Sequence, residues 1–289
     1  MLYGIYYAYW EQEWGGDFIP YVEKVKRLGF DILEVACQKL TEASDQYLLE
    51  LREKAQEAGI ILTGGYGPSR AYHIADSDPA VVKAAFAKYQ GIFEKMKLAG
   101  IEKLGGGLYS YWPADYSVPP DKPGDLRRSV ANTRALADMA ADYGITLGME
   151  VLNRFEGYLL NTCQEAVDFV VQVDRPNVKV MLDTFHMNIE EDSFGAAIRL
   201  AGPYLGHLHV GEANRRPPFP GGRIPWEEIG EALGDIGYTG TVVMEPFVRM
   251  GGTVGRDIRV WHDLSQGCPE EKLDLDAAAA VRYLRGLWG

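Results

Sequence analysis

Short apolar runs rich in β-prone residues alternate with longer segments of helical periodicity along the whole chain. The apolar runs occupy residues 2–7, 31–36, 60–63, 102–107, 144–150, 178–183, 204–210 and 241–245. Apolar residues recur at helical spacing in residues 17–28, 46–58, 79–99, 125–143, 193–201, 226–235 and 274–287, and in a segment that Thr162 caps. Strand-then-helix alternation predicts a parallel sheet, and eight such units in a chain of this length predict a closed (β/α)₈ barrel.

The main alternative to the barrel is an open, doubly wound α/β sheet. Such a sheet usually has a glycine-rich phosphate-binding turn after its first strand. The corresponding residues here, Tyr7 to Glu13, contain no glycine. We therefore expect an α/β fold of the TIM-barrel type, with residues 1–289 forming a single catalytic domain.

Several of the expected strands end in a side chain that can bind a metal. Glu150, Asp183, His209 and Glu245 lie at or near the ends of the fifth to eighth runs. Active sites of this fold lie at the carboxyl ends of the strands, so these side chains should converge. Three carboxylates and one imidazole suit Mg²⁺ or Mn²⁺ and also admit Co²⁺, whereas Zn²⁺ usually prefers more nitrogen or sulfur ligands. The alternative is that each residue is an isolated salt bridge or helix cap.

Composition narrows the class of protein further. The formal net charge of −12 disfavours a nucleic-acid partner, which needs a basic surface. The three cysteines are odd in number and far apart, so neither a disulfide framework nor a thiolate metal site is expected. Residues 1–7 have no basic lead, and no stretch approaches the ~20 apolar residues of a spanning helix. We expect a cytoplasmic enzyme with no membrane partner.

Five stretches of the chain carry a family resemblance over nearly its whole length. They are residues 4–14, 110–113, 150–156, 180–192 and 243–253. In these stretches the chain resembles the ketose 3-epimerases, the D-psicose (D-allulose) and D-tagatose 3-epimerases, which belong to the xylose isomerase-like barrels. The resemblance implies that Glu150, Asp183, His209 and Glu245 bind Mn²⁺ or Co²⁺, with Mg²⁺ also compatible. It also implies a ketohexose substrate and a homodimer or homotetramer.

The resemblance also assigns substrate contacts. It implies that Glu156, His186 and Arg215 contact the O1–O3 end of the sugar. The alternatives are a surface carboxylate at Glu156, a helix cap at His186, and a different arginine from the loop of Arg215. Aromatic side chains are expected around the C4–C6 end, or else in the core, and two glycines should leave room there; these residues are Tyr6, Trp14, Trp112, Phe247, Gly65 and Gly107.

The expected reaction interconverts C3 epimers of free ketohexoses, D-fructose with D-psicose and D-tagatose with D-sorbose. The proton at C3, next to the C2 carbonyl, must leave and return on the other face through a cis-enediolate. A divalent ion bridging O2 and O3 would stabilise that species. Glu150 and Glu245 lie three strands apart, roughly 135° around the barrel axis, and can act as opposed acid/base groups.

Two further polar residues, Glu34 and His207, lie in the expected strands, and two other functions must be compared with the epimerase reaction. Glu34 ends the second run and is expected to support the site from behind or to pair with a nearby base. His207 is expected to point away from His209 and to pack outside the barrel. A metal-dependent abasic-site endonuclease would use more histidine ligands and a basic DNA-binding face, whereas this chain has five histidines in all and a net charge of −12. A non-catalytic sugar-binding protein would not need opposed carboxylates at a metal.

Overall fold

The computed structural model of the chain describes residues 1–117 and 119–289. Its centre is a closed barrel in which neighbouring strands are parallel and β8 pairs with β1. The strands are β1 Leu2–Tyr6, β2 Ile32–Ala36, β3 Ile61–Gly65, β4 Lys103–Gly106, β5 Thr146–Glu150, β6 Val178–Asp183, β7 Leu205–Val210 and β8 Thr241–Met244. The predicted (β/α)₈ barrel is therefore confirmed, and each strand begins and ends close to its expected position.

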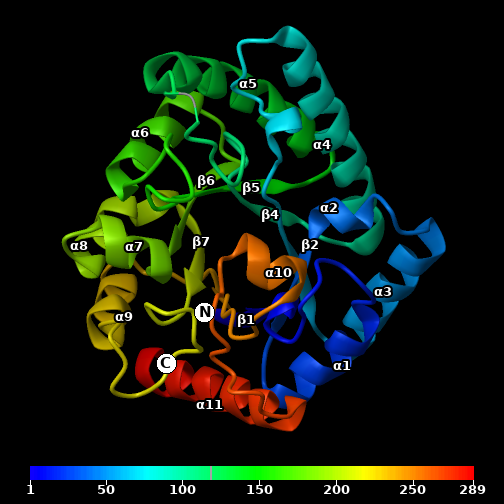
Figure 1. Ribbon diagram of the computed structural model, residues 1–289, viewed down its shortest axis with the longest axis vertical. Coiled ribbons are helices and arrows are strands. Elements are labelled where there is room, and N and C mark those ends of the chain that lie inside the picture. The colour runs from blue at the N-terminus through cyan, green and yellow to red at the C-terminus, as the bar shows by residue number, and fades with distance from the viewer. Residues whose placement is uncertain (118) are drawn as a thin grey trace.

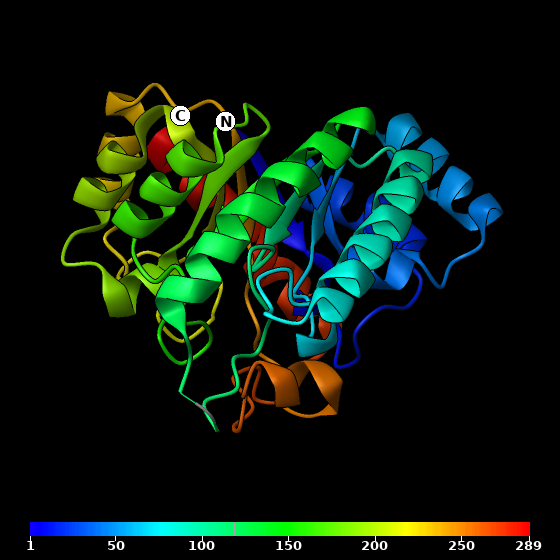
Figure 2. The ribbon, with the colours of Figure 1, turned by 90° about the horizontal axis from the view of Figure 1, so that it is seen from above.

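Longer helices surround the barrel, and shorter ones lie next to strand ends (Figures 1 and 2). The outer helices are α1 Ile19–Leu28, α3 Asp45–Ala58, α4 Pro79–Ala99, α5 Lys122–Asp142, α6 Cys163–Val173, α8 Phe194–Ala201, α9 Trp226–Asp235 and α11 Glu270–Trp288. The short ones are α2 Cys37–Leu40, α7 Thr184–Glu190 and α10 Gly252–Asp257, with 3₁₀ turns at Tyr7–Tyr9, Arg70–Tyr72 and Gly202–Tyr204. Within the described ranges, no helix is long and apolar enough to cross a membrane.

Local sequence explains where the outer helices stop and start. Gly29, Gly59 and Gly100 close their helices in the left-handed conformation that glycine adopts without a Cβ penalty. Thr162 begins α6 in a capping box, in which its side chain accepts from the backbone of Glu165 while the Glu165 carboxylate accepts from the backbone of Thr162. These caps fix the residue at which each of these helices begins or ends, and they thereby help to set where the neighbouring strand joins the sheet.

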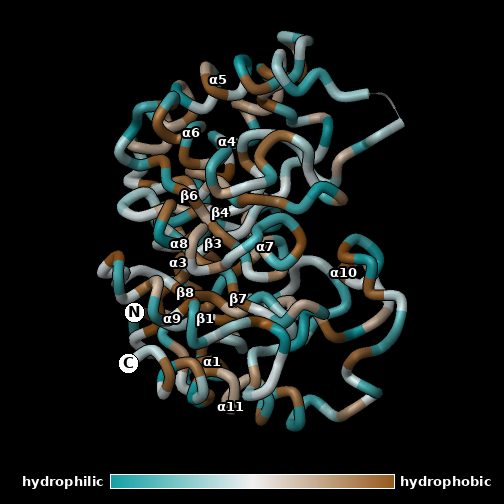
Figure 3. The backbone as a smooth tube through the Cα atoms, turned by 90° about the vertical axis from the view of Figure 1, so that its left-hand side faces the viewer, coloured by the Kyte–Doolittle hydropathy of each residue, from teal (hydrophilic) through white to brown (hydrophobic). Residues whose placement is uncertain are grey.

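The strands are buried on both faces, as expected for a parallel sheet covered by helices. Every residue of β2 and β8 is buried, and β1 exposes only Leu2. Figure 3 shows hydrophobic colour on many of the central strand segments and hydrophilic colour on much of the outer helices and loops. The buried polar side chains of the strands are therefore exceptions, and they gather inside the barrel.

The short helices α2, α7 and α10 were not predicted from the sequence. Each has seven residues or fewer, which is too short to establish a helical period. In α7 the first turn is capped by the strand-ending Asp183, which accepts from the backbone N–H of Phe185 at 2.7 Å. Helix α11 also begins four residues before the expected Asp274, with Glu270 and Glu271 in its first turn.

Candidate metal centre and active site

Four side chains at consecutive strand ends converge on one point. Glu150 ends β5, Asp183 ends β6, His209 is the penultimate residue of β7, and Glu245 directly follows β8. Asp183 and His209 are paired in the sheet register. Each residue offers one ligand atom, and these atoms lie within 4.8 Å of one another. The sequence-predicted set is therefore brought together at the carboxyl end of the barrel.

The geometry of His209 tests whether this set fits a cation. Its Nδ1 is buried and has no hydrogen-bond partner among residues 1–117 and 119–289. That atom lies 3.6 Å from Glu245 Oε2 and 4.0 Å from Glu150 Oε1. An unpaired imidazole nitrogen facing carboxylate oxygens is a donor arrangement that suits a divalent cation. The side chains present therefore fit a divalent metal ion.

Arg215 places a positive charge beside two of these carboxylates. Its Nη1 donates to Asp183 Oδ2 at 2.9 Å and to Glu245 Oε2 at 2.8 Å. The guanidinium also lies 3.8 Å from the ring centre of Phe185. Of the arginines in this loop, Arg215 is the one that lines the cavity, so the structure places the arginine that the resemblance indicated at the site.

Burial and charge separate the acidities of two of the carboxyl groups. Burial raises the pKa of Glu150 well above its usual range, and the neighbouring Glu245 raises it further. Burial also opposes ionisation of Asp183, but Arg215 and the nearby imidazoles lower the pKa of Asp183 to about 2. Side chains only a few ångströms apart thus meet different electrostatic environments.

A cavity of about 350 Å³ opens onto this centre. Its polar lining includes Glu150, Glu156, His186, His209, Arg215 and Glu245. The predicted aromatic and glycine residues that line it are Tyr6, Trp14, Trp112, Gly65 and Gly107. Asp183, which is 1% exposed, and Phe247, which is 2% exposed, are not among the lining residues. Phe247 lies behind the wall, with its ring centre 6.2 Å from that of Tyr6 and 6.1 Å from that of Trp14.

Asn153, which sequence reasoning missed, organises the polar side of the cavity. Its side-chain amide donates to Glu156 Oε1 at 3.2 Å, and its backbone N–H donates to His186 Nδ1 at 3.2 Å. Trp112 Nε1 donates to the other oxygen of Glu156 at 3.0 Å. His186 lies within α7, with Nε2 3.7 Å from Glu150 Oε1. Glu156 and His186 therefore face the cavity in fixed orientations.

The end of helix α10 adds two lining residues that the sequence did not reveal, its last residue Asp257 and the following Ile258. Figure 1 shows α10 in front of the barrel, and Trp14 Nε1 donates to Asp257 Oδ2 at 2.9 Å. No periodic pattern marks so short a helix, so only its position in space identifies it as part of the cavity.

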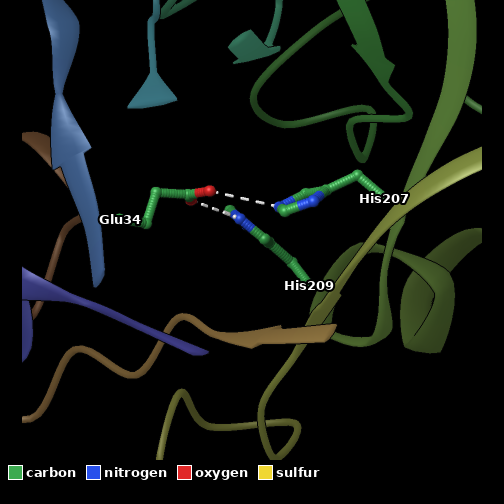
Figure 4. Close-up of side chains that lie close together, drawn as sticks. All are labelled: Glu34, His207 and His209. Atoms are coloured by element: carbon green, nitrogen blue, oxygen red, sulfur yellow. Dashed lines mark hydrogen bonds and ion pairs between the residues drawn. The ribbon is translucent and has the colours of Figure 1, made fainter. Parts of the chain in front are cut away.

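His207 corrects one expectation. It is 1% exposed and lies inside the barrel beside His209, with ring centres 5.0 Å apart. Side chains two residues apart in a strand point to the same face, so the expected outward position was wrong. Glu34 faces both imidazoles from the opposite side of the barrel interior (Figure 4): its oxygens are 2.6 Å from His209 Nε2 and 3.2 Å from His207 Nε2. Glu34 therefore lies on the inner side of the proposed metal ligands and also pairs with a basic side chain, His209.

Comparisons with known proteins agree with this geometry. Residues 22–267 match the family model of the xylose isomerase-like TIM barrel. The chain is 57% identical to a D-psicose 3-epimerase of Ruminiclostridium cellulolyticum over 99% of its length and 97% of the relative. A crystal structure of D-psicose 3-epimerase with D-tagatose from Clostridium cellulolyticum H10 superposes with a TM-score of 0.98 at 56% identity, covering 100% of this chain and 99% of the other. A D-psicose 3-epimerase crystallised in the presence of D-fructose gives 0.97 at 55% identity, with both chains fully covered. The chain therefore belongs to the xylose isomerase-like TIM barrels and, among them, to the ketose 3-epimerase family, and it is an isomerase of the epimerase type.

Proposed function

We propose that this protein interconverts the C3 epimers of free ketohexoses, D-fructose with D-psicose and D-tagatose with D-sorbose. The observation that carries the proposal is the convergence of Glu150 and Glu245 with Asp183 and His209 at the base of one cavity of about 350 Å³. The similar crystal structures prepared with D-tagatose and D-fructose support this choice of substrates.

Glu150, Asp183, His209 and Glu245 would hold one divalent cation, Mn²⁺ or Co²⁺. When bound, the cation supplies electrophilic stabilisation for negative charge that develops on the sugar oxygens. Arg215 complements it by keeping a positive charge against Asp183 and Glu245. Because the ligands lie at or beside the ends of barrel strands, they are held in place before substrate arrives.

Glu150 and Glu245 carry the proton transfers in this proposal. One group, as a carboxylate, takes the proton from C3, which leaves an enediolate of the sugar, and the other, as a carboxylic acid, gives its proton to the opposite face. Two groups on separate strands allow inversion at C3 without turning the sugar over. Each must keep an oxygen free for this work while its other oxygen binds the cation.

The remaining lining residues orient the sugar. Glu156, His186 and Arg215 would hydrogen-bond the O1–O3 end, since all three are fixed by neighbours beside the proposed metal site. Tyr6, Trp14 and Trp112 would pack along the C4–C6 end, with Phe247 behind Tyr6 and Trp14 as a support, and Gly65 and Gly107 leaving space. Apolar walls discriminate weakly between hydroxyl configurations, so several ketohexoses should be accepted.

The resemblance adds two properties to the proposal. Residues 1–289 would act as one catalytic domain, and the active form would be a homodimer or homotetramer. Sedimentation of the metal-loaded protein would measure the oligomer, and a monomer of full activity would contradict this part.

The decisive experiment incubates metal-loaded protein with D-fructose and follows the sugars by chromatography. We expect D-psicose to accumulate until the two epimers reach equilibrium. A parallel incubation with DNA containing an abasic site tests the endonuclease alternative. Nicking of the DNA without sugar conversion would overturn the proposal. Sugar binding without conversion would indicate the non-catalytic alternative instead.

A further inference from the structure

Directly behind the metal centre, the barrel interior contains a connected set of polar side chains that the proposed reaction does not use. Glu34, Thr63, His207 and Thr241 are all buried, and Lys103 reaches them from β4. Figure 4 shows Glu34 from β2 and the two histidines of β7 pointing toward one another. Buried polar groups are costly unless they are paired, so this set requires a physical reason.

The direction of the hydrogen bonds can be followed from Lys103. Its ammonium donates to Thr241 Oγ1 at 2.6 Å and to the Gly206 carbonyl at 2.7 Å. Thr241 Oγ1 lies 2.6 Å from His207 Nδ1, and within residues 1–117 and 119–289 its only other hydrogen bond is the one that it accepts from Lys103. The hydroxyl therefore has its own proton to donate to Nδ1. A neutral His207 then carries its proton on Nε2, which faces Glu34.

The two oxygens of Glu34 face Thr63 and both histidines. Thr63 Oγ1 donates to Oε2 at 2.7 Å, and His207 Nε2 lies 3.2 Å from the same oxygen. The other oxygen, Oε1, is 2.6 Å from His209 Nε2. With a carboxylate as its acceptor, His209 Nε2 keeps its proton. A neutral His209 then offers the lone pair of Nδ1, and this is the atom that faces Glu150 and Glu245.

We propose that Glu34 is a positioning residue of the metal centre: it fixes His209 in the Nε2–H tautomer and aims Nδ1 at the cation. Thr63 and the Lys103–Thr241–His207 chain hold the Glu34 carboxylate in place for this task. This inference rests on the metal site of the proposed function. Carboxylates behind metal-binding imidazoles act in this way, and their loss typically lowers metal affinity about 10–100-fold.

A second cation held by Glu34, His207 and His209 is the competing explanation, because their donor atoms also lie within 4.8 Å of one another. One observation favours the hydrogen-bonded network. Glu34 Oε1 and His209 Nε2 are 2.6 Å apart, which is a direct hydrogen bond with no room for an ion between them.

The test titrates metal-free protein with Mn²⁺ by calorimetry and counts bound metal by elemental analysis. Wild type should bind one Mn²⁺ per chain. Glu34→Gln keeps the shape of the side chain but removes the charge, and it should bind Mn²⁺ about 10–100-fold more weakly. The Co²⁺-loaded variant should also show an altered visible absorption spectrum, because the orientation of one ligand has changed. A residue with only a structural role would not alter that spectrum.

Asp125→Asn is the matched control, since it converts another buried carboxylate to an amide. Asp125 pairs with Arg128 and accepts from Tyr158 at 2.6 Å, and it does not line the active-site cavity. This variant should keep the Mn²⁺ affinity and the Co²⁺ spectrum of wild type, whatever happens to its stability. If Asp125→Asn weakened Mn²⁺ binding as much as Glu34→Gln, the effect would not be specific and the inference would fail.

Three other outcomes decide between the explanations. Equal Mn²⁺ affinity in wild type and Glu34→Gln would overturn the positioning role and leave the proposed function intact. Two Mn²⁺ per wild-type chain, with one lost in Glu34→Gln, would overturn it in favour of a second cation. No Mn²⁺ or Co²⁺ binding by wild type would instead count against the proposed metal site itself. If Glu34→Gln does not fold, Thr63→Val removes one bond to Glu34, and its affinity must then fall several-fold.

Discussion

Arg215 illustrates how much one side chain contributes to the active site. Its backbone adopts a left-handed φ of 63°, which is uncommon for a residue with a side chain. The guanidinium is held by Asp183, Glu245 and the ring of Phe185, and these contacts offset the cost of that conformation. The strained residue lies beside the proposed metal ligands, where it balances part of their negative charge.

The opposed-carboxylate mechanism is tested by replacing Glu150 or Glu245 with Gln. Either change keeps the shape and one oxygen but removes a base, so net epimerisation should fall by several orders of magnitude. The remaining carboxylate can still exchange a proton on one face. In D₂O each variant should therefore exchange the C3 proton of one epimer, and the two variants should prefer opposite epimers.

Metal content must be measured in both Gln variants, because each substitution also alters a proposed ligand. The comparison is made at equal Mn²⁺ occupancy. Near-wild-type interconversion by both metal-loaded variants would show that these carboxylates are not the two bases.

Gly107 provides a prediction about substrate breadth. A Cβ at this position would meet only Leu152, at 3.4 Å, so a side chain can be added without displacing backbone. Gly107→Val should fold and should narrow the cavity, which would raise KM for ketohexoses more than for the shorter ketopentoses. Steady-state kinetics on both sugar classes would measure this. Unchanged KM ratios would mean that Gly107 does not border the bound sugar.

Gly106 is the informative contrast to Gly107. It has a φ of 130°, and a Cβ there would lie 2.2 Å from the Tyr66 carbonyl oxygen. Gly106→Ala should therefore destabilise the barrel itself, whereas Gly107→Val should leave the melting temperature nearly unchanged.

At the scale of elements, one residue can both end a strand and cap the helix that follows. Asp183 closes β6 and also caps α7, so the turn that brings His186 to the cavity is fixed by a proposed metal ligand. By contrast, α6 is capped by Thr162 and Glu165, which do not line the cavity. Weakening the Asp183 cap should therefore lower both stability and activity. Weakening the Thr162 cap should lower stability alone.

Thr162→Ala tests that distinction. The substitution removes the hydroxyl that accepts from the Glu165 backbone and should lower the free energy of unfolding by about 0.5–2 kcal/mol. Thr162→Ser retains the hydroxyl and is the matched control. The kcat of both variants should equal that of wild type, measured alongside denaturant unfolding. A large loss of kcat in Thr162→Ala alone would show that α6 transmits strain to the site.

In the whole molecule, the proposed ligands lie at the ends of four adjacent strands, β5 to β8, so the three carboxylates of the proposed metal site share one half of the barrel. Without a cation, these carboxylates repel one another inside the barrel and weaken the fold. Metal binding should therefore be visible in global stability as well as in turnover.

Removal of the metal by chelation should abolish epimerisation and lower the melting temperature. At a free Mn²⁺ concentration of 100 times Kd, binding should stabilise the folded state by about 2.7 kcal/mol. Scanning calorimetry of chelated and reloaded protein would measure the shift. Asp183→Asn, which removes the charge of one ligand, should show a smaller shift. Full activity in protein shown to be metal-free by elemental analysis would end the metal hypothesis.

Much of this protein could be predicted from local sequence. Eight apolar runs with intervening helical periods specified the barrel, because parallel strands need helical connections. Gly29, Gly59 and Gly100 marked helix ends through their left-handed conformation. Polar residues at the ends of apolar runs identified the proposed ligand set. The two-residue strand period also predicts that His207 and His209 point to the same face, so the expected outward position of His207 was a wrong interpretation of that pattern.

Tertiary structure decided the features that depend on residues far apart in sequence. Glu34 and His209 are 175 positions apart in the sequence, and only closure of the barrel brings Glu34 Oε1 to 2.6 Å from His209 Nε2. Tertiary structure also decided the position of α10, whose Asp257 accepts a hydrogen bond from Trp14 at the mouth of the cavity. It likewise placed Phe247, which is buried behind the cavity wall that it was expected to form. Periodicity and capping act over a few residues and therefore specify elements. Which side chains share a cavity depends on strand order, register and packing, which no local pattern records.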